Sequence, residues 1–221
     1  MQRIIHQFWV GPFRIPKREK AWMEGMRALH PTYEYHLWTD DNLPSIVLPH
    51  IDERLKWRMS QGDYALASDI LKIYMVWHLG GIYLDADTEP RRGMAGFPVE
   101  QYSGIFRHHS DQDITISADF GGMSAGHPLG RSLLETMHAP AYDFGPHWLG
   151  RYTRAFLGLP VEAGHHQVRT GLAQHGFVYM PSGEHDAPHT GPDYWYRRFG
   201  NGALFSWSAE NRIKFIRGEY E

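Results

Sequence analysis

Residues 64–90 constrain the fold more than any other part of the chain. Apolar side chains cover almost every side of a helix over 64–79, which predicts a helix buried in the protein. Two glycines follow, and glycine is favoured just beyond the C-terminus of a helix. A short apolar strand and two acidic residues complete the segment, in the order Gly80-Gly81-Ile82-Tyr83-Leu84-Asp85-Ala86-Asp87. The segment therefore predicts a buried helix, a sharp stop, and a buried strand that ends in two carboxylates.

The expected helix carries one polar cluster, formed by Ser68, Asp69 and Lys72. Residues three and four apart share a face of a helix, so these side chains should lie together. A charge in a buried helix must be paired or must serve a function. An Asp69–Lys72 ion pair that only satisfies itself is one interpretation. The acidic pair further along the chain favours the other, a binding site.

Asp85 and Asp87 form an Asp-x-Asp pair at the end of the expected strand. Side chains at i and i+2 of a strand point to the same side, and open α/β sheets bind ligands at the carboxyl ends of their strands. Two adjacent carboxylates repel each other, and a hard divalent cation with oxygen ligands relieves that cost. A diphosphate can complete the coordination, and the metal then neutralises charge on the departing phosphate. The sequence thus predicts a site for a cation bound to a diphosphate.

The order of expected elements predicts an α/β fold. Strand, helix and strand follow one another within the first forty residues, and loop-like sequence fills 182–202. We expect strands over 3–10, 33–38, 82–84, 102–108, 113–118, 177–181 and 203–207, and helices over 16–29, 52–79 (broken near Gly62), 128–138 and 147–157.

The composition indicates a globular protein and excludes several other classes of protein. A chain of 221 residues that is 42% hydrophobic can bury the core of one domain. The net charge of −3 gives no sign of a nucleic-acid partner, and the lack of cysteine excludes disulfides and thiolate metal sites. No apolar run reaches the ~20 residues of a transmembrane span, and residues 1–10 do not form a signal peptide. We expect a cytoplasmic protein, either in solution or bound peripherally to the inner face of the membrane.

These motifs resemble those of glycosyltransferases with a GT-A fold and an Asp-x-Asp sugar-binding motif. That family includes yeast α-1,6-mannosyltransferase, bacterial capsule and lipopolysaccharide transferases, and the glucosylating domains of large clostridial toxins. The resemblance is carried by residues 4–11, Trp22, and residues 31–40, 67–72 and 80–87. It implies a Rossmann-like α/β fold with a mixed, mostly parallel sheet flanked by helices. It also implies one domain over 1–221, with a nucleotide-sugar-binding half over 1–90 and an acceptor-side half over 91–221.

The resemblance implies a role for each matching polar residue. Trp9 would stack on the nucleotide base, and Asp69 would hydrogen-bond the donor's sugar or ribose. Asp85 would bind ribose or sugar hydroxyls beside the cation, and Asp87 would ligate the metal directly. Lys72 stands where the family commonly has arginine, so it keeps the positive charge without the planar fork. We therefore expect Asp69, Asp85 and Asp87 to be catalytic, and Trp9, Asp69, Lys72 and Asp85 to bind the donor.

Relatives commonly take a further metal ligand from a C-terminal loop, often near a Ser-Trp pair. Ser206 and Trp207 form such a pair here. We select His189 as the candidate third metal ligand beside Asp85 and Asp87. Alternatives in the same polar stretch are Glu184, His185 and Asp186, and Arg197 and Arg198 are candidates for phosphate contact.

The function implied is metal-dependent transfer of a hexose, with Mn²⁺ or Mg²⁺ as cofactor and retention of the anomeric configuration. The donor would be a UDP- or GDP-sugar, and the acceptor a glycan or other hydroxyl, as in polysaccharide biosynthesis. Two other functions stay open. A metal-dependent phosphohydrolase is disfavoured, because its acidic pair would follow the first strand. A non-catalytic module that binds nucleotide-sugars or glycans would bind a donor without turning it over.

Overall fold

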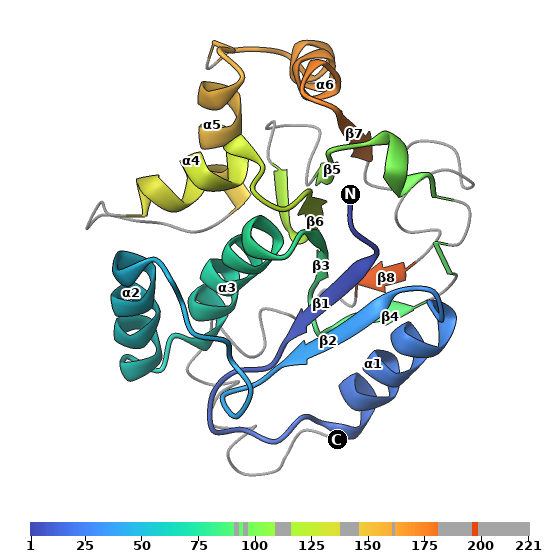
Figure 1. Ribbon diagram of the computed structural model, residues 1–221, viewed down its shortest axis with the longest axis vertical. Helices are drawn as coiled ribbons and strands as arrows, with labels where there is room; N and C mark the ends of the chain where they lie inside the picture. The colour runs from blue at the N-terminus through green and yellow to red at the C-terminus, as the bar shows by residue number, and fades with distance from the viewer. Residues whose placement is uncertain are drawn as a thin grey trace.

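The computed structural model describes residues 1–90, 93–94, 97–108, 116–137, 146–160, 162–180 and 196–198. Strands and helices are interspersed along the described chain, as Figure 1 shows. In chain order the elements are β1 (Ile4–Phe8), α1 (Lys17–Leu29), β2 (Glu34–Trp38), α2 (Pro49–Ser60), α3 (Tyr64–His78), β3 (Gly81–Leu84), β4 (Thr88–Pro90), the 3₁₀ helix η1 (Val99–Gln101), β5 (Gly104–His108), β6 (Ile116–Met123), α4 (Pro128–Thr136), α5 (Pro146–Phe156), α6 (His165–Gln174), β7 (Phe177–Met180) and β8 (Tyr196–Arg198).

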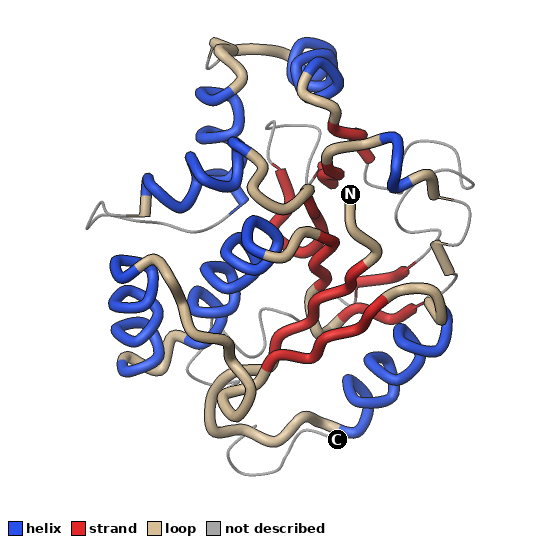
Figure 2. Tube along the Cα trace, viewed as in Figure 1, coloured by secondary structure: helices blue, strands red, loops and turns tan. Residues whose placement is uncertain are grey.

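A six-stranded sheet in the order β2-β1-β3-β6-β5-β7 forms the centre of the molecule (Figure 2). The pairs β1–β2, β1–β3 and β5–β7 are parallel, and β6 runs antiparallel to both of its neighbours. The expected α/β fold with a mixed, mostly parallel sheet is confirmed. The sheet contains strands from both sides of residue 90, and the proposed division of the domain at that residue stays a prediction.

Helices cover both faces of this sheet. Buried residues of α2, α3, α4 and α5 form one core cluster, whereas Met26 of α1 belongs to a second cluster with Ile5 and Ile105. Strand β3 lies between the two: Tyr83 belongs to the first cluster, and Ile82 and Leu84 belong to the second. All four residues of β3 are buried. Because both faces of the strand are buried, its sequence is continuously apolar and does not alternate between apolar and polar residues.

Several boundaries differ from those expected from sequence. The expected helix over 52–79 is two helices, α2 and α3, separated where Gly62 adopts a φ of 69°. Helix α6 was not expected, since its apolar stripe is weak. Strand β6 continues to Met123, beyond the end of the expected strand over 113–118. Residues 196–198, expected to be loop, form β8 and pair with β4, while the expected strand over 203–207 lies outside the described residues.

Gly81 lets β3 lie close against β1. It has a φ of 102°, and a Cβ atom there would stand 2.6 Å from the carbonyl oxygen of Ile4. A side chain would therefore meet both backbone strain and a collision with the neighbouring strand. The double glycine thus ends α3 and also allows the next strand to join the sheet.

His6 ties the three parallel strands together from inside the protein. Its side chain is 0% exposed, with Nε2 2.8 Å from the carbonyl oxygen of Gly80. The indole Nε1 of Trp38 donates to His6 Nδ1 over 3.0 Å. Nδ1 is therefore an acceptor and Nε2 the donor, so the ring is neutral. Burial lowers the pKa of His6 to about 4.

We predict that His6 makes the protein less stable in mild acid. The unfolded histidine binds a proton near pH 6.5, and the folded one only near pH 4. The contribution is therefore complete above pH 6.5 and is lost as the pH falls toward 4, by about 3 kcal/mol. Urea unfolding at pH 7 and pH 4.5 should show a smaller loss for His6→Gln than for the wild type. His166→Gln, at an exposed position of α6, should behave as the wild type; equal losses in all three proteins would contradict the prediction.

Candidate active site: a lysine between two aspartates

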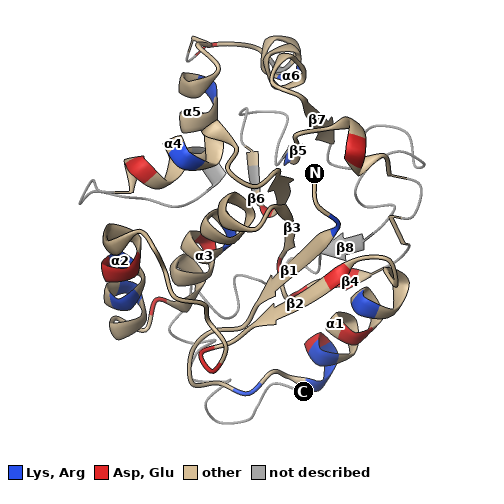
Figure 3. Ribbon diagram, in the orientation of Figure 1, with Lys and Arg blue, Asp and Glu red and all other residues tan. Residues whose placement is uncertain are grey.

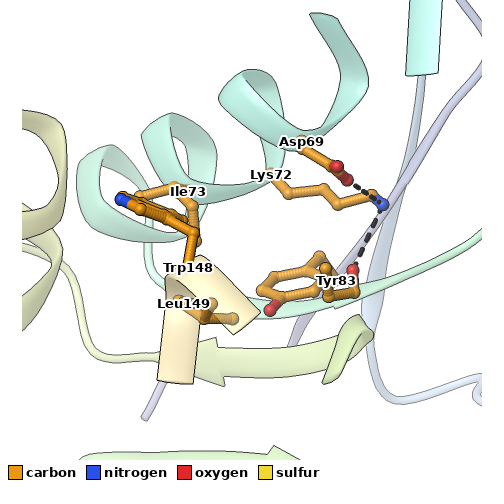
Figure 4. A pocket seen from close by; sticks show the side chains of 7 residues that line it. Asp69, Lys72, Ile73, Tyr83, Trp148 and Leu149 are labelled. Atoms are coloured by element: carbon orange, nitrogen blue, oxygen red, sulfur yellow. Dashed lines mark hydrogen bonds and ion pairs between the residues drawn. The ribbon is translucent and has the colours of Figure 1, made fainter. Parts of the chain in front are cut away.

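Lys72 joins the polar cluster of α3 to the acidic pair that follows β3. Its ammonium lies 2.8 Å from Asp69 Oδ1 and also forms an ion pair with Asp85 Oδ1. A third contact of 3.2 Å reaches the carbonyl oxygen of Ala118 on β6 (Figure 4). The side chain of Lys72 is 8% exposed, and those of Asp69 and Asp85 are 19% and 17% exposed. Lys72 therefore forms the ion pair with Asp69 that was one interpretation of the sequence. It also binds Asp85 of the Asp-x-Asp motif, which the other interpretation assigned to a binding site.

Electrostatics hold Lys72 in the charged state. Burial alone would lower the pKa of its ammonium, but the carboxylates of Asp69 and Asp85 outweigh burial and raise the pKa above its ordinary value. A buried ammonium with two carboxylate partners and a carbonyl acceptor uses all three of its donors. The cation is therefore permanent at neutral pH, and it fixes both acidic side chains.

Backbone contacts hold Asp85 in place from the sheet side. Its N–H donates to the carbonyl oxygen of Asp119 over 2.9 Å, and its own carbonyl accepts from Gln7 Nε2 over 3.0 Å. The hydroxyl of Tyr35 in turn donates to Gln7 Oε1. These contacts come from β6, β1 and β2. Asp85 therefore sits where three strands fix its position.

Asp87 lies beyond the strand rather than on it. Strand β3 ends at Leu84, and residues 86–87 form a turn before β4 begins. The expectation that Asp85 and Asp87 share one side of a strand was therefore wrong in its geometry, although both remain at the carboxyl edge of the sheet. Asp87 is 7% exposed, and Lys72 pairs with Asp85.

No group of three or more His, Cys, Asp or Glu side chains that could hold a metal is found among the described residues. His189, Glu184, His185, Asp186 and the Ser206–Trp207 pair lie outside these residues, so their roles stay predictions. The carboxylates of Asp85 and Asp87 suit a hard cation. Mg²⁺ is typically held by one or two carboxylates together with substrate phosphates. The acidic pair fits that mode of binding, with the remaining positions taken by water or substrate.

A small opening adjoins the lysine cluster. Its lining combines charged and apolar side chains, and α3, β3, β6 and α5 contribute to it: Asp69, Lys72, Ile73, Tyr83, Ala118, Trp148 and Leu149 (Figure 4). The side chain of Tyr83 is 0% exposed, and its hydroxyl has no hydrogen-bond partner within the described part of the chain. Buried hydroxyls are normally paired. A hydroxyl of this kind in the wall of an opening is suited to a polar ligand.

Other expected residues lie at the same edge of the sheet. Trp9 directly follows β1, is half-buried, and donates from Nε1 to the carbonyl oxygen of Phe13 over 2.8 Å. In the backbone ladder of β4 and β8, Thr88 is opposite Arg198 and Glu89 is opposite Arg197. The backbone of the two arginines therefore runs beside the residues that follow Asp87.

Sequence reasoning missed the partners from later strands. Asp119 is 2% exposed, and its carboxylate accepts from Arg107 Nη1 over 2.7 Å. Trp148 on α5 and the hydroxyl of Tyr83 were not singled out either. Asp119 is an acidic residue in a mostly apolar strand, and this feature of the sequence could have indicated that it has a partner. No local pattern indicated that it would lie beside Asp85.

Comparison with known proteins agrees with this geometry. Residues 16–104 match the family described as "Glycosyltransferase sugar-binding region containing DXD motif". The chain is similar to a solved structure titled "PaToxG Glycosyltransferase", with a TM-score of 0.61, 16% identity, and coverage of 79% of this chain and 78% of that one. Residues 16–104 are thus similar to the DXD region of that family, and the fold is the GT-A fold. The expected family resemblance and fold are confirmed.

Curated relatives are named for mannose transfer. "Inositol phosphoceramide mannosyltransferase 3" of Schizosaccharomyces pombe is 29% identical over 180 residues, covering 74% of this chain and 48% of that protein. "Mannosyl phosphorylinositol ceramide synthase SUR1" of Saccharomyces cerevisiae is 27% identical, covering 66% of this chain and 37% of that protein. The chain thus spans about half or less of the length of these relatives. Among the described residues, no helix is long and apolar enough to cross a membrane.

We predict that loss of the Lys72 cation destabilises the DXD region. Lys72→Met leaves Asp69 and Asp85 facing each other without a cation, which should lower the free energy of unfolding by about 2–4 kcal/mol. Lys72→Arg should retain most of the stability. Urea unfolding at neutral pH measures both effects.

The surface pair Lys56–Asp52 provides the matched control. Lys56 has a side chain that is 72% exposed, so Lys56→Met should change stability by about 0.5 kcal/mol or less. Adding Asp69→Asn to Lys72→Met should restore part of the loss, because one carboxylate no longer needs the cation. A Lys72→Met protein as stable as the wild type would refute the role given to the ammonium.

Proposed function

We propose that this protein is a metal-dependent glycosyltransferase that moves a hexose from a nucleoside-diphosphate sugar to a hydroxyl acceptor. The observation that supports this most is the placement of the Asp-x-Asp pair at the carboxyl edge of a GT-A sheet, with Asp85 fixed by Lys72 and Asp87 placed beyond it. Open α/β sheets bind ligands at this edge. A DXD region that matches over 16–104 supports the same assignment.

The two acids take different parts in the proposed reaction. Asp87 would hold a Mn²⁺ or Mg²⁺ ion together with the donor diphosphate, and His189 is the candidate additional ligand. When bound, the ion neutralises the charge that develops on the departing nucleoside diphosphate. Asp85 is held by Lys72, by the backbone carbonyl of Asp119 and by the side-chain amide of Gln7. It would therefore accept hydrogen bonds from ribose or sugar hydroxyls at a fixed position.

The lysine cluster would orient the transferred sugar. Asp69 presents a carboxylate, and Tyr83 a hydroxyl, to the opening beside Lys72. A carboxylate and a hydroxyl can bind sugar hydroxyls as acceptor and donor, which positions the ring before transfer. Trp9, at the end of β1, would stack on the nucleotide base. The family resemblance implies retention of the anomeric configuration, and we propose that the acceptor attacks on the face of the sugar from which the diphosphate leaves, without a covalent nucleophile from the protein.

The donor we propose first is a mannose nucleotide, because the curated relatives are named as mannosyltransferases. A glycan or lipid-linked hydroxyl would be the acceptor. A panel of UDP- and GDP-sugars tested with Mn²⁺ by thermal shift should reveal the best donor, since a ligand of the folded state raises its stability. Metal-dependent binding without donor hydrolysis or transfer would favour the non-catalytic module instead.

We predict that Asp87→Asn lowers sugar transfer about a hundredfold or more, since charge stabilisation at a leaving group has effects of this size. EDTA should abolish wild-type transfer, and added Mn²⁺ or Mg²⁺ should restore it. The measurement is release of nucleoside diphosphate from the preferred donor with an acceptor present.

Asp52→Asn is the matched control for this substitution. Asp52 lies on α2 and pairs with Lys56 at the surface, so its loss should leave transfer unchanged. Transfer that persists in EDTA, or in Asp87→Asn, would rule out the proposed mechanism.

A further inference from the structure

Residues 14–20 form the densest cluster of cations in the sequence, here called the cationic segment. It reads Arg14-Ile15-Pro16-Lys17-Arg18-Glu19-Lys20 and holds four of the chain's 22 lysines and arginines. An even spread would place about one of them in seven residues. The whole chain has a net charge of −3, so the excess of positive charge in this segment is opposite in sign to the net charge of the protein.

The fold turns the positive charges of this segment outward and its acid inward. Arg14, Lys17 and Lys20 are exposed, and none of them has an ion pair among the described residues. Glu19 is 1% exposed and is bound by Arg18, whose Nε donates to its Oε1 over 3.0 Å. The exposed charges of the segment are therefore all positive. Figure 3 shows Lys and Arg positions in blue on the ribbon of the loop before α1 and of its first turns.

Apolar and aromatic groups accompany the charges. Phe13, Ile15 and Trp22 are half-buried, and the Arg18 guanidinium lies 4.8 Å above the Trp22 ring. Acidic neighbours are fewer: Glu24 is exposed one turn along α1, and Asp40 accepts from the Gly11 N–H over 2.8 Å. Exposed Asp41 lies beyond it, and exposed Arg27 offsets Glu24. The segment therefore keeps an excess of positive charge beside partly exposed aromatic rings.

The cationic segment lies at the edge of the sheet that carries the DXD pair. Strands β1 and β3 are parallel, and His6 is in register with Tyr83. Their carboxyl ends therefore meet, and Gln7 contacts the backbone of Asp85. The chain leaves β1 at this point and runs directly into the segment. Phe13 also packs edge-on against Tyr64 at the start of α3, with 6.1 Å between the rings.

We infer that the cationic segment docks this protein on an anionic lipid surface, so that the carboxyl edge of the sheet faces an acceptor held in that surface. Exposed lysines and arginines attract acidic headgroups, and adjacent aromatic rings anchor a protein at the interface. Two relatives named for inositol phosphoceramide concern a lipid that carries phosphate. The lipid acceptor rests on the proposed transferase function, whereas the membrane contact does not.

Vesicle sedimentation with the full chain tests this contact. The wild type should bind phosphatidylcholine vesicles that contain phosphatidylinositol and should bind pure phosphatidylcholine about tenfold more weakly or worse. Raising the salt to about 0.5 M should weaken binding, because exposed charges are then screened. The triple variant Arg14→Gln/Lys17→Gln/Lys20→Gln should lose about tenfold to a hundredfold in binding, since each such cation strengthens binding about fivefold.

A second triple variant, Lys56→Gln/Arg131→Gln/Arg151→Gln, removes three exposed cations from α2, α4 and α5 and should bind as the wild type does. Equal loss in both triple variants, or no wild-type binding to anionic vesicles at low salt, would overturn the inference. Loss of nucleotide-sugar binding by the first triple variant without vesicles would also overturn it, because the segment would then serve the donor phosphates.

Failure of the proposed function would look different. Asp87→Asn should bind anionic vesicles as the wild type does, because its charge change lies outside the cationic segment. If the wild type binds vesicles but transfers sugar from no donor, the transferase proposal fails and the lipid contact stands. If transfer to a soluble acceptor proceeds but vesicles are not bound, the lipid contact fails alone.

Discussion

The Lys72 ammonium is the contact on which the arrangement of the site depends. It joins α3 to the end of β3 by binding Asp69 and Asp85, and it reaches β6 through the carbonyl oxygen of Ala118. Without a cation between them, the two ionised carboxylates would repel each other, and one of them would tend to take up a proton. A helix that is otherwise apolar can therefore lie against the sheet and still carry charge. The same contact keeps the acid that begins the DXD motif at a fixed position before any ligand arrives.

The sheet also fixes the position of Asp85, through contacts between residues that are far apart in sequence. His6 links Gly80 to Trp38, Gln7 binds the backbone of Asp85, and Gly81 lets β3 approach β1 without a clash. Each contact comes from the strands that precede the motif. Residues at the start of the chain thus determine where an acid some eighty residues later stands, which explains why the family resemblance includes both segments.

Much of this could be read from the sequence, because burial leaves a local signature. The apolar helix, the double glycine and the short strand predicted α3 and β3 closely, and a charged pair in a buried helix predicted that Lys72 had a partner. What could not be read depended on tertiary pairing. The Arg107–Asp119 contact requires the order of β5 and β6 in the sheet, and β8 was hidden in a polar stretch, since its pairing with β4 leaves no apolar pattern. The turn at Asp87 was missed because an Asp-x-Asp pair looks the same on a strand or beyond it.

Charge explains how the two acids of the DXD pair suit the proposed chemistry. Lys72 binds both Asp69 and Asp85. A donor diphosphate would bring further negative charge to this edge, where Asp85 and Asp87 already stand. A divalent cation that bridges the diphosphate and Asp87 would turn that repulsion into attraction. Lys72 leaves Asp85 as a hydrogen-bond acceptor of fixed position, since its charge is already compensated. Asp85 would thus orient the sugar nucleotide, and Asp87 would hold the cation that neutralises charge on the departing diphosphate.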